Sequence, residues 1–307
     1  MPRKVILDMD PGVDDALGLC VALASNELEV VAVTATGGNV LPALATRNVQ
    51  AIIENLDPQR WPRIGAATAE QPLRTDGRDL HGSDGLGGAE FQVAELANRH
   101  ASIKVISDEI RQAPGEVTVV CSGPLSNLAA VLQREPDIAQ AIGQVIVVGG
   151  AVACGGNITP AAEFNIYCDA ESARDVLRSR ITKTLLPLDV TRQLSMRFDL
   201  LDLVKQGDGR TARLLDRILP GYYRAYRHRM GMEGIFVHDA VGVVMAMHPE
   251  LFTTEPMSGD VETAGDLTYG ATVFDRRSKP DSQPNMEVVT EMDVAAVRDC
   301  LLRGVKG

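Results

Sequence analysis

Aromatic residues and cysteines are scarce in this sequence of 307 residues. Only 4% of the residues are aromatic, and the single tryptophan is Trp61. The five cysteines are an odd number without a Cys-x-x-Cys spacing, and Cys20 and Cys121 lie in apolar runs. Thiols in such runs behave as small apolar residues, and this usage fits a reducing cytoplasm rather than a compartment that favours disulfides.

Long apolar segments and an excess of positive charge are also lacking. No stretch of about 20 apolar residues occurs, and the N-terminus enters a strand pattern at once, so we expect neither a membrane span nor a signal peptide. The formal net charge of -11 disfavours nucleic acid and anionic membranes as partners. It suits a neutral small-molecule substrate, or one that is held through a cation.

Buried strands alternate with helices along most of the chain. Apolar strands are predicted at residues 5–7, 29–35, 62–66, 117–121, 145–148 and 184–188. Because near-continuous Val/Ile/Leu strands need helices on both faces, the pattern predicts an α/β fold with an open, mostly parallel, doubly wound sheet. Strand-like segments between residues 257 and 290 predict an antiparallel C-terminal extension. No linker interrupts the pattern, so we expect residues 1–307 to form a single domain.

Three other segments carry simpler expectations. Residues 70–92 form a long loop rich in glycine and aspartate, and ordered loops of this length are often functional. Residues from Leu200 to His228 are predicted to be helical, with the basic stretch Arg224–Arg229 as a solvated face. Four methionines near this helix and the next are expected to fill the core: Met230, Met232, Met245 and Met247.

The most distinctive stretch is Val5–Leu17, where an apolar strand runs directly into four aspartates. These are Asp8, Asp10, Asp14 and Asp15, with a Pro11-Gly12 turn between the pairs. Carboxylates this close repel one another, and the helix N-terminus that follows offsets only part of that cost. A hard cation with oxygen ligands, Ca²⁺ or Mg²⁺, offsets far more. The stretch therefore predicts a metal site.

Polar residues follow several of the predicted strands. Asp10, Asn39, Ser126 and Asn157 each come after a strand, and ligands of open α/β sheets bind beyond the carboxyl ends of the strands. A backbone carbonyl of the Gly123–Asn127 loop is a further candidate ligand for the cation. Asp239, at the start of an apolar helix, is another. A vicinal diol could complete the coordination, so the sugar of a ribonucleoside fits.

Together these motifs resemble the inosine–uridine-preferring nucleoside hydrolases over nearly the whole chain. The matching blocks, in the order of the family, are Asp8–Ala16, Gly37–Asn39, His81–Leu86, Gly123–Asn127, Ala162–Asn165 and Val237–Ala240. The resemblance implies Ca²⁺-dependent hydrolysis of the N-glycosidic bond of ribonucleosides, preferably uridine, inosine or both, to ribose and free base. It also implies a homotetramer or homodimer that serves nucleoside salvage or catabolism.

Site residues follow from the match to the family. Ca²⁺ would be held by Asp10, Asp15, Asp239 and the carbonyl of Ser126. The family usually has threonine at position 126, and a carbonyl ligand is indifferent to that change. The ribose hydroxyls and the 5′ end would be bound by Asp14, Asn39, Asn157, Glu163 and Asn165. Phe164 lies in the same block and is also expected to contact the substrate.

The resemblance also implies how the bond is cleaved. Asp10 would act as the general base on a water molecule held by Ca²⁺, and direct attack would invert the anomeric carbon. His238 would assist the departing base, because histidine titrates near neutral pH. His81 and Tyr226 could also reach the base, with Tyr222 one helical turn before Tyr226. The presence of both histidines looks like the branch that acts on pyrimidine nucleosides, on inosine, or on both.

Two other hypotheses stay open at this point. Asp8 and Asp10 match the Asp-x-Asp of haloacid dehalogenase-type phosphatases, whose first aspartate is the nucleophile, although the Pro11-Gly12 turn intervenes. The same scaffold could also be a non-catalytic, Ca²⁺-dependent nucleoside-binding protein. In the hydrolase interpretation, Asp8 shares a strand face with Asp10 and is expected to support the site from behind.

Overall fold

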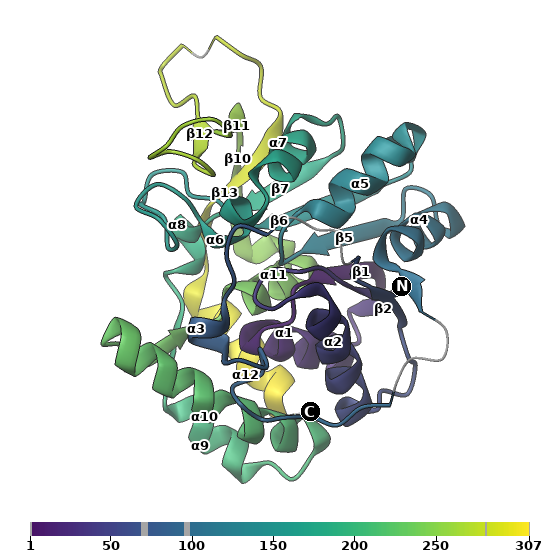
Figure 1. The fold of residues 1–307 in the computed structure, drawn as a ribbon, viewed down its shortest axis with the longest axis vertical. Helices are drawn as coiled ribbons and strands as arrows, with labels where there is room; N and C mark the ends of the chain where they lie inside the picture. Colours follow the sequence, from purple (N-terminus) through teal and green to yellow (C-terminus); the bar gives the residue numbers. More distant parts are fainter. Residues whose placement is uncertain (1, 69–72, 95–98, 280, 307) are drawn as a thin grey trace.

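A nine-stranded sheet forms the centre of the described part of the chain, which comprises residues 2–68, 73–94, 99–279 and 281–306 of this computed structural model. Residues 70–72 of the predicted loop and both ends of the predicted 1–307 domain lie outside the described residues. The strand order is β10-β13-β7-β6-β5-β1-β2-β3-β4 (Figure 1). The strands are β1 (Arg3–Met9), β2 (Leu28–Ala35), β3 (Arg63–Ala66), β4 (His100–Ala101), β5 (Val117–Cys121), β6 (Gln144–Val148), β7 (Lys183–Leu186), β10 (Phe252–Met257) and β13 (Met286–Met292).

Helices cover both faces of this sheet, as the apolar strands predict. One face carries α1 (Val13–Ala24), α2 (Pro42–Leu56), α11 (His238–Met247) and α12 (Val294–Lys306), and the other carries α4 (Ser102–Gln112), α5 (Ser126–Arg134) and α7 (Ala170–Arg178). Successive residues of β1 divide between the two apolar clusters: Val5 and Leu7 join the first, and Ile6 joins the second. The doubly wound α/β fold is therefore confirmed.

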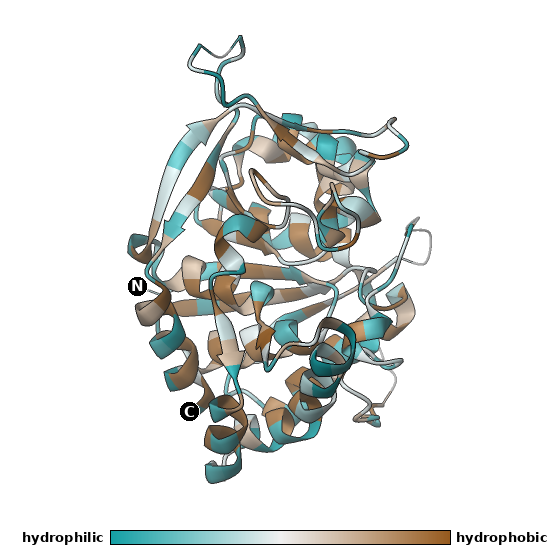
Figure 2. Cartoon of the chain, turned by 90° about the vertical axis from the view of Figure 1, so that its left-hand side faces the viewer, coloured by the Kyte–Doolittle hydropathy of each residue, from teal (hydrophilic) through white to brown (hydrophobic). Residues whose placement is uncertain are grey.

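Hydrophobic and hydrophilic residues alternate in bands along the outer helices, as expected for helices that have one side on the sheet and the other in solvent (Figure 2). The predicted helix from Leu200 to His228 is in fact two helices, α9 (Asp199–Gln206) and α10 (Arg210–Met230). Gly207 and Gly209 lie between them, and glycine readily interrupts a helix. None of the helices in the described ranges is long and apolar enough to cross a membrane.

An antiparallel C-terminal extension of the sheet is confirmed, but its edge strand β10 was not among the segments that the sequence predicted for it between residues 257 and 290. Edge strand β10 runs antiparallel to β13, but β13 pairs with β7 in parallel. The long connection between β7 and β13 passes through several helices, so the chain can enter β13 in the same direction as β7. The alternating pattern of a short strand does not reveal its direction relative to its neighbour. Pro256 lies in β10, where an edge strand tolerates the missing N–H.

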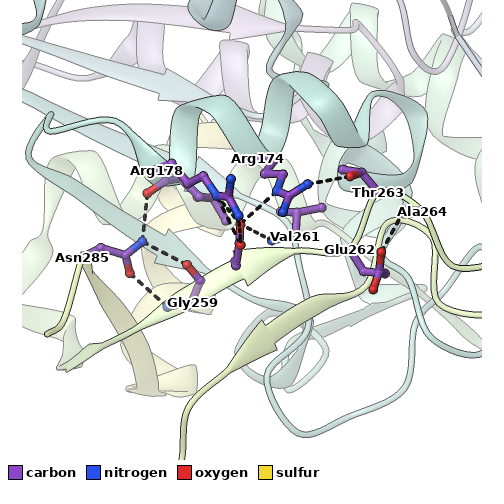
Figure 3. Close-up of polar contacts among 10 residues, drawn as sticks. Arg174, Arg178, Gly259, Val261, Glu262, Thr263, Ala264 and Asn285 are labelled. Carbon is purple, nitrogen blue, oxygen red and sulfur yellow. Dashed lines mark hydrogen bonds and ion pairs between the residues drawn. The ribbon is translucent and has the colours of Figure 1, made fainter. Parts of the chain in front are cut away.

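A separate hairpin, β11 (Gly259–Val261) and β12 (Thr272–Phe274), lies outside the main sheet and is anchored to α7 (Figure 3). Arg178 Nη2 lies 2.5 Å from Asp260 Oδ2, and Arg174 Nη1 donates to Thr263 Oγ1 at 2.8 Å. Asn285 Nδ2 donates to the carbonyl of Gly259 at 2.9 Å and to that of Leu177 in α7 at 3.0 Å. These polar contacts attach the hairpin to the helix layer.

Several short elements complete the fold. They are α3 (Arg78–His81), α6 (Phe164–Cys168), α8 (Leu188–Thr191), the pair β8 (Ser195–Arg197) and β9 (Gly234–Phe236), and two 3-10 turns, η1 (Pro136–Gln140) and η2 (Pro249–Leu251). Backbone hydrogen bonds continue past the strand ends, from Thr36 N to Met9 O and from Ser122 N to Asp8 O, both at 2.9 Å. The loops after β1, β2 and β5 are thereby brought together.

Candidate active site

A cavity of about 370 Å³ lies where these loops meet α3 and α10. All the residues that the sequence assigned to substrate line it: Asp14, Asn39, His81, Asn157, Glu163, Phe164, Asn165 and Tyr226. His238 and Asp239 line it as well. Asp10, Asp15 and Ser126 are buried and are not among its lining residues. The structure thus gathers residues from six distant segments around one space.

Three carboxylates converge at this cavity. Oxygen atoms of Asp14, Asp15 and Asp239 lie within 4.8 Å of one another. Burial, and then the charge of Asp14, raises the pKa of Asp15 to about 7. Burial, and then the charges of Asp14 and Asp15, raises the pKa of Asp239 well above its usual value. Like charges held so close in a buried site are costly, and a bound cation offsets that cost.

Unpartnered oxygen atoms point to the same conclusion. Asp10 Oδ2 accepts a hydrogen bond of 2.6 Å from the backbone N–H of Asn39. Asp10 Oδ1 and Asp14 Oδ1 are buried and have no hydrogen-bond partner within the described segments. Burial, and then the charge of Asp15, raises the pKa of Asp10 well above its usual value. Because the available donors are all oxygen atoms, they fit a hard divalent cation such as Ca²⁺ or Mg²⁺.

The geometry divides the aspartates differently from the sequence. It groups Asp14 with Asp15 and Asp239, whereas the family match gave Asp14 to the ribose and Asp10 to the metal. Asp14 and Asp15 are consecutive residues in the first turn of α1, so the backbone places their carboxylates close to each other. Asp10 lies before α1, directly after the last residue of β1.

Asp8 supports the site without facing the cavity. Its Oδ1 accepts hydrogen bonds from Thr34 Oγ1 at 2.6 Å and from Asn127 Nδ2 at 2.8 Å. Burial raises the pKa of Asp8 to about 6. These two hydrogen bonds tie the Asp8 side chain to β2 and α5, which does not favour it as the nucleophile that a phosphatase of the haloacid dehalogenase type requires. The supporting position predicted for Asp8 agrees with these contacts.

A side-chain hydrogen bond holds Ser126 in place. It begins α5, and its Oγ donates a hydrogen bond of 2.5 Å to Asp169 Oδ2. Threonine could make the same bond, because it carries the same hydroxyl. The next residue, Asn127, is bound to Asp8, so two buried carboxylates fix the start of α5.

The polar end of the cavity offers defined donors and acceptors. Asn165 Nδ2 donates to the carbonyls of Ser122 at 2.8 Å and Val148 at 3.1 Å, which leaves its Oδ1 as the atom that can accept from a ligand. Asn157 Oδ1 accepts from the Phe164 N–H at 2.8 Å, which leaves the Asn157 amide hydrogens for a ligand.

Glu163 has a structural task that the sequence did not reveal. Its carboxylate caps α6 by accepting from the backbone N–H groups of Asn165 and Ile166, and it also accepts from Gly150. Burial raises the pKa of Glu163. The side chain therefore joins the loop after β6 to α6 at the edge of the cavity.

An aromatic wall lines another side of the cavity. Ring centroids follow one another from His81 to Tyr222 at 4.8 Å, to Tyr226 at 4.9 Å, to Phe236 at 6.1 Å and to His238 at 5.3 Å. The hydroxyls of Tyr222 and Tyr226 lie 3.4 Å apart. Flat, apolar faces with a few polar edges suit the binding of a planar heterocycle.

His81 is not a loop residue, as the sequence predicted, but the last residue of α3, and it is buried. The backbone N–H of Val13 donates to its Nδ1 at 3.0 Å, so in the neutral ring the hydrogen is on Nε2. Burial lowers the pKa of His81. The glycine-rich loop after it packs against α2 through Asn48, whose Nδ2 donates to the carbonyl of Asp84 at 2.8 Å.

His238 is neutral near pH 7, contrary to the expectation that it titrates there. Burial lowers its pKa to about 4. Its Nδ1 lies 2.8 Å from Thr191 Oγ1. It can therefore donate or accept a hydrogen bond at neutral pH, but it does not carry a positive charge.

Several cavity residues escaped prediction. Thr191, Arg192 and Phe236 line the cavity, and no spacing in the sequence marks them. The predicted strand at 184–188 ends early because Pro187 stops it, and α8 follows. Met230, expected in the core, is 49% exposed and lines the cavity, because α10 ends there. The basic end of α10 is only partly a solvated face, since Arg229 also lines the cavity.

Comparisons with known proteins agree over almost the whole chain. The sequence model of a family described as inosine-uridine preferring nucleoside hydrolase matches residues 5–299. A probable uridine nucleosidase 2 of Arabidopsis thaliana is 32% identical over 311 residues, covering 96% of this chain and 95% of that protein. The pyrimidine-specific ribonucleoside hydrolase RihA of Shigella boydii is also 32% identical, covering 100% and 99%. A solved plant nucleoside hydrolase, the PpNRh1 enzyme, has a TM-score of 0.93 at 29% identity and covers both chains fully.

Proposed function

This chain belongs to the inosine-uridine preferring nucleoside hydrolase family, and from that premise we propose that it hydrolyses uridine, and inosine, with the help of a bound Ca²⁺ ion. The products are ribose and the free base. Two relatives that are named for uridine and for pyrimidine nucleosides, each 32% identical, support uridine as the preferred substrate.

One observation carries the proposal. Buried carboxylates converge on a cavity of about 370 Å³ that is also lined by an aromatic wall. Small-molecule sites have volumes in this range, roughly 300 to 1,000 Å³. A nucleoside has a polyhydroxylated sugar at one end and a flat base at the other, and the polar and aromatic sides of the cavity match those two halves.

The acidic residues would hold the cation. Asp10, Asp15, Asp239 and the carbonyl of Ser126 are the proposed ligands, with Asp14 beside them. When bound, Ca²⁺ would neutralise the buried carboxylates, orient a sugar diol and lower the pKa of a water molecule. The unpartnered Oδ1 atoms of Asp10 and Asp14 support this assignment.

Asp10 acts as the general base. Its Oδ2 accepts a hydrogen bond from the Asn39 N–H, which orients the carboxylate that takes the proton of the attacking water. The water oxygen forms a bond to C1′ as the bond from C1′ to the base nitrogen breaks. The sugar becomes positively charged in this transition state. The Asp14 carboxylate and the Asn165 amide oxygen favour that charge.

The departing base takes the electron pair of the broken bond. A neutral His238 is suited to donate a hydrogen bond to the anionic base, because it lacks the second proton that a cationic imidazolium would transfer to the base. His81, with its hydrogen on Nε2, can donate in the same way. Tyr226 and Phe164 contribute aromatic surface to the base. The base is finally protonated from solvent, and Asp10 releases the proton that it took from water.

A reducing-sugar assay over a panel of nucleosides tests the proposal. Uridine, cytidine, inosine and guanosine are incubated with the Ca²⁺-loaded protein, and we expect ribose release from uridine, from inosine, or from both. Calorimetry is run on the same panel. Tight binding of uridine without release of ribose would favour the non-catalytic nucleoside-binding protein instead.

We further propose that residues 1–307 act as a single domain, within a homotetramer or homodimer, in the cytoplasm. All five cysteines are free, which supports a reducing compartment. Sedimentation velocity tests the assembly. A species of 32.9 kDa, the mass of one chain, would contradict it.

A further inference from the structure

The short helix α8 and the residue after it form hydrogen bonds with the loop at residues 152–156. The carboxylate of Asp189 accepts hydrogen bonds from the backbone N–H groups of residues 152–154, at 2.7 to 2.9 Å. The guanidinium of Arg192 donates to the carbonyls of Gly155 at 3.1 Å and Gly156 at 2.8 Å. Because both ends of α8 are tied to the same loop, the residues between them are held in place.

Thr191 lies between these two anchors and contacts His238. Its Oγ1 is 2.8 Å from His238 Nδ1, and its side chain is 1% exposed. No other residue of the described chain hydrogen-bonds the His238 ring, so Nε2 is left for a ligand in the cavity that both residues line. The ring of Phe236 packs at 5.3 Å from that of His238 and supports it from one side.

The hydroxyl hydrogen of Thr191 has two possible acceptors. The carbonyl of Pro187 is 3.4 Å away, and His238 Nδ1 is 2.8 Å away. Hydrogen bonds from a hydroxyl are normally shorter than about 3.0 Å, so Nδ1 is the better acceptor. When Nδ1 accepts, the hydrogen of the neutral ring is on Nε2.

We propose that Thr191 is a positioning residue that fixes the ring of His238 with its Nε2–H directed at the departing base. This inference rests on the proposed hydrolysis of nucleosides. The bond between C1′ and the base nitrogen breaks, its electron pair goes to the base, and the carbonyl oxygens of the base share the negative charge. The Nε2–H hydrogen bond stabilises that charge, and solvent later supplies the proton of the free base.

The test compares a poor leaving group with a good one. The full-length, Ca²⁺-loaded Thr191→Val variant is assayed on uridine and on p-nitrophenyl β-D-ribofuranoside, whose p-nitrophenolate departs without a hydrogen-bond donor. We expect kcat on uridine to fall about tenfold to a hundredfold, because an oriented donor is lost. The kcat on the p-nitrophenyl riboside should change little, and Thr191→Ser should restore activity on uridine.

Thr184→Val is the matched control. Thr184 is buried in β7 and does not line the cavity, so this variant should keep the activity on both substrates. An equal loss on both substrates for Thr191→Val would overturn the proposal, since it would indicate a merely structural role. No loss on either substrate would overturn it as well.

A second measurement keeps the test decisive if Thr191→Val does not fold. Nitrogen-15 chemical shifts of the His238 ring in the unmodified protein report which nitrogen carries the hydrogen. We expect a protonated Nε2 and an unprotonated Nδ1, and the reverse would overturn the proposal. If the unmodified protein releases ribose from neither substrate, the proposed function fails instead, and the two failures are thus distinguishable.

Discussion

Replacing Asp15 with asparagine should stabilise the metal-free protein at alkaline pH relative to the unmodified chain. The Asp15 side chain is 0% exposed, and burial raises its pKa from 3.8 to about 7. Between these two pH values the folded protein retains a proton that the unfolded protein has released. The free energy of unfolding therefore falls as the pH rises through this window, and the loss is complete above the folded pKa.

The size of the effect follows from the shift. About 3 pKa units at about 1.4 kcal/mol each correspond to roughly 4 kcal/mol. Asparagine does not titrate, so its variant should escape this loss. It does lose one acceptor, because Asp15 receives hydrogen bonds from Gly12 N at 2.9 Å and Ser122 Oγ at 2.7 Å. That costs roughly 1 to 3 kcal/mol, but equally at every pH.

Urea unfolding in the presence of a chelator, from pH 4 to pH 8, measures the difference. The stability of Asp15→Asn relative to the unmodified protein should rise by up to about 4 kcal/mol across this range. Asp189→Asn is the control: burial alone would raise the pKa of Asp189, but hydrogen bonds from the backbone N–H groups of residues 152–154 outweigh it and lower the pKa below its usual value of 3.8. The folded and unfolded protein therefore both carry this residue ionised above about pH 4, and the relative stability of that variant should stay nearly level from pH 4 to pH 8. A flat profile for Asp15→Asn would refute the reasoning.

Three further substitutions test the site. Asp10→Ala should abolish ribose release from uridine, because this change removes the proposed general base, which is also a proposed cation ligand; a fully active variant would contradict the mechanism. Gly38→Ala should weaken Ca²⁺ binding in calorimetry, because a Cβ there would collide with Asp10 Oδ2, and unchanged affinity would contradict this. His238→Ala should lower kcat on inosine by about 10² or more with little change in KM. An unchanged kcat would move the role to His81 or Tyr226.

Much of the fold follows from local patterns. The alternation along β1 sends Val5 and Leu7 to one helix layer and Ile6 to the other, and the same regularity places most strands within one or two residues. The relative direction of paired strands was not predictable from such patterns. Nothing in the spacing of Met286–Met292 reveals that β13 runs parallel to β7, because that depends on the path of the long connection before it.

The candidate site was predictable where chemistry is concentrated in short motifs. The clustered aspartates near the N-terminus and the polar residues after strands indicated where carboxylates and amides would meet. The environment of single side chains was not predictable. His238 is neutral because other segments bury it, and Met230 faces the cavity because α10 ends at Gly231. Thr191 carries no sequence signal, since only the folded chain brings it within 2.8 Å of a histidine 47 positions away.

We propose that nucleoside hydrolysis by this protein requires a cation that the buried carboxylates around the cavity hold. The most direct measurement is ribose release from uridine by the Ca²⁺-loaded protein, by the same protein after chelation, and after Ca²⁺ is added back. We expect steady release, its loss on chelation and its return with Ca²⁺. Release at the same rate after exhaustive chelation, or none from the loaded protein, would contradict it.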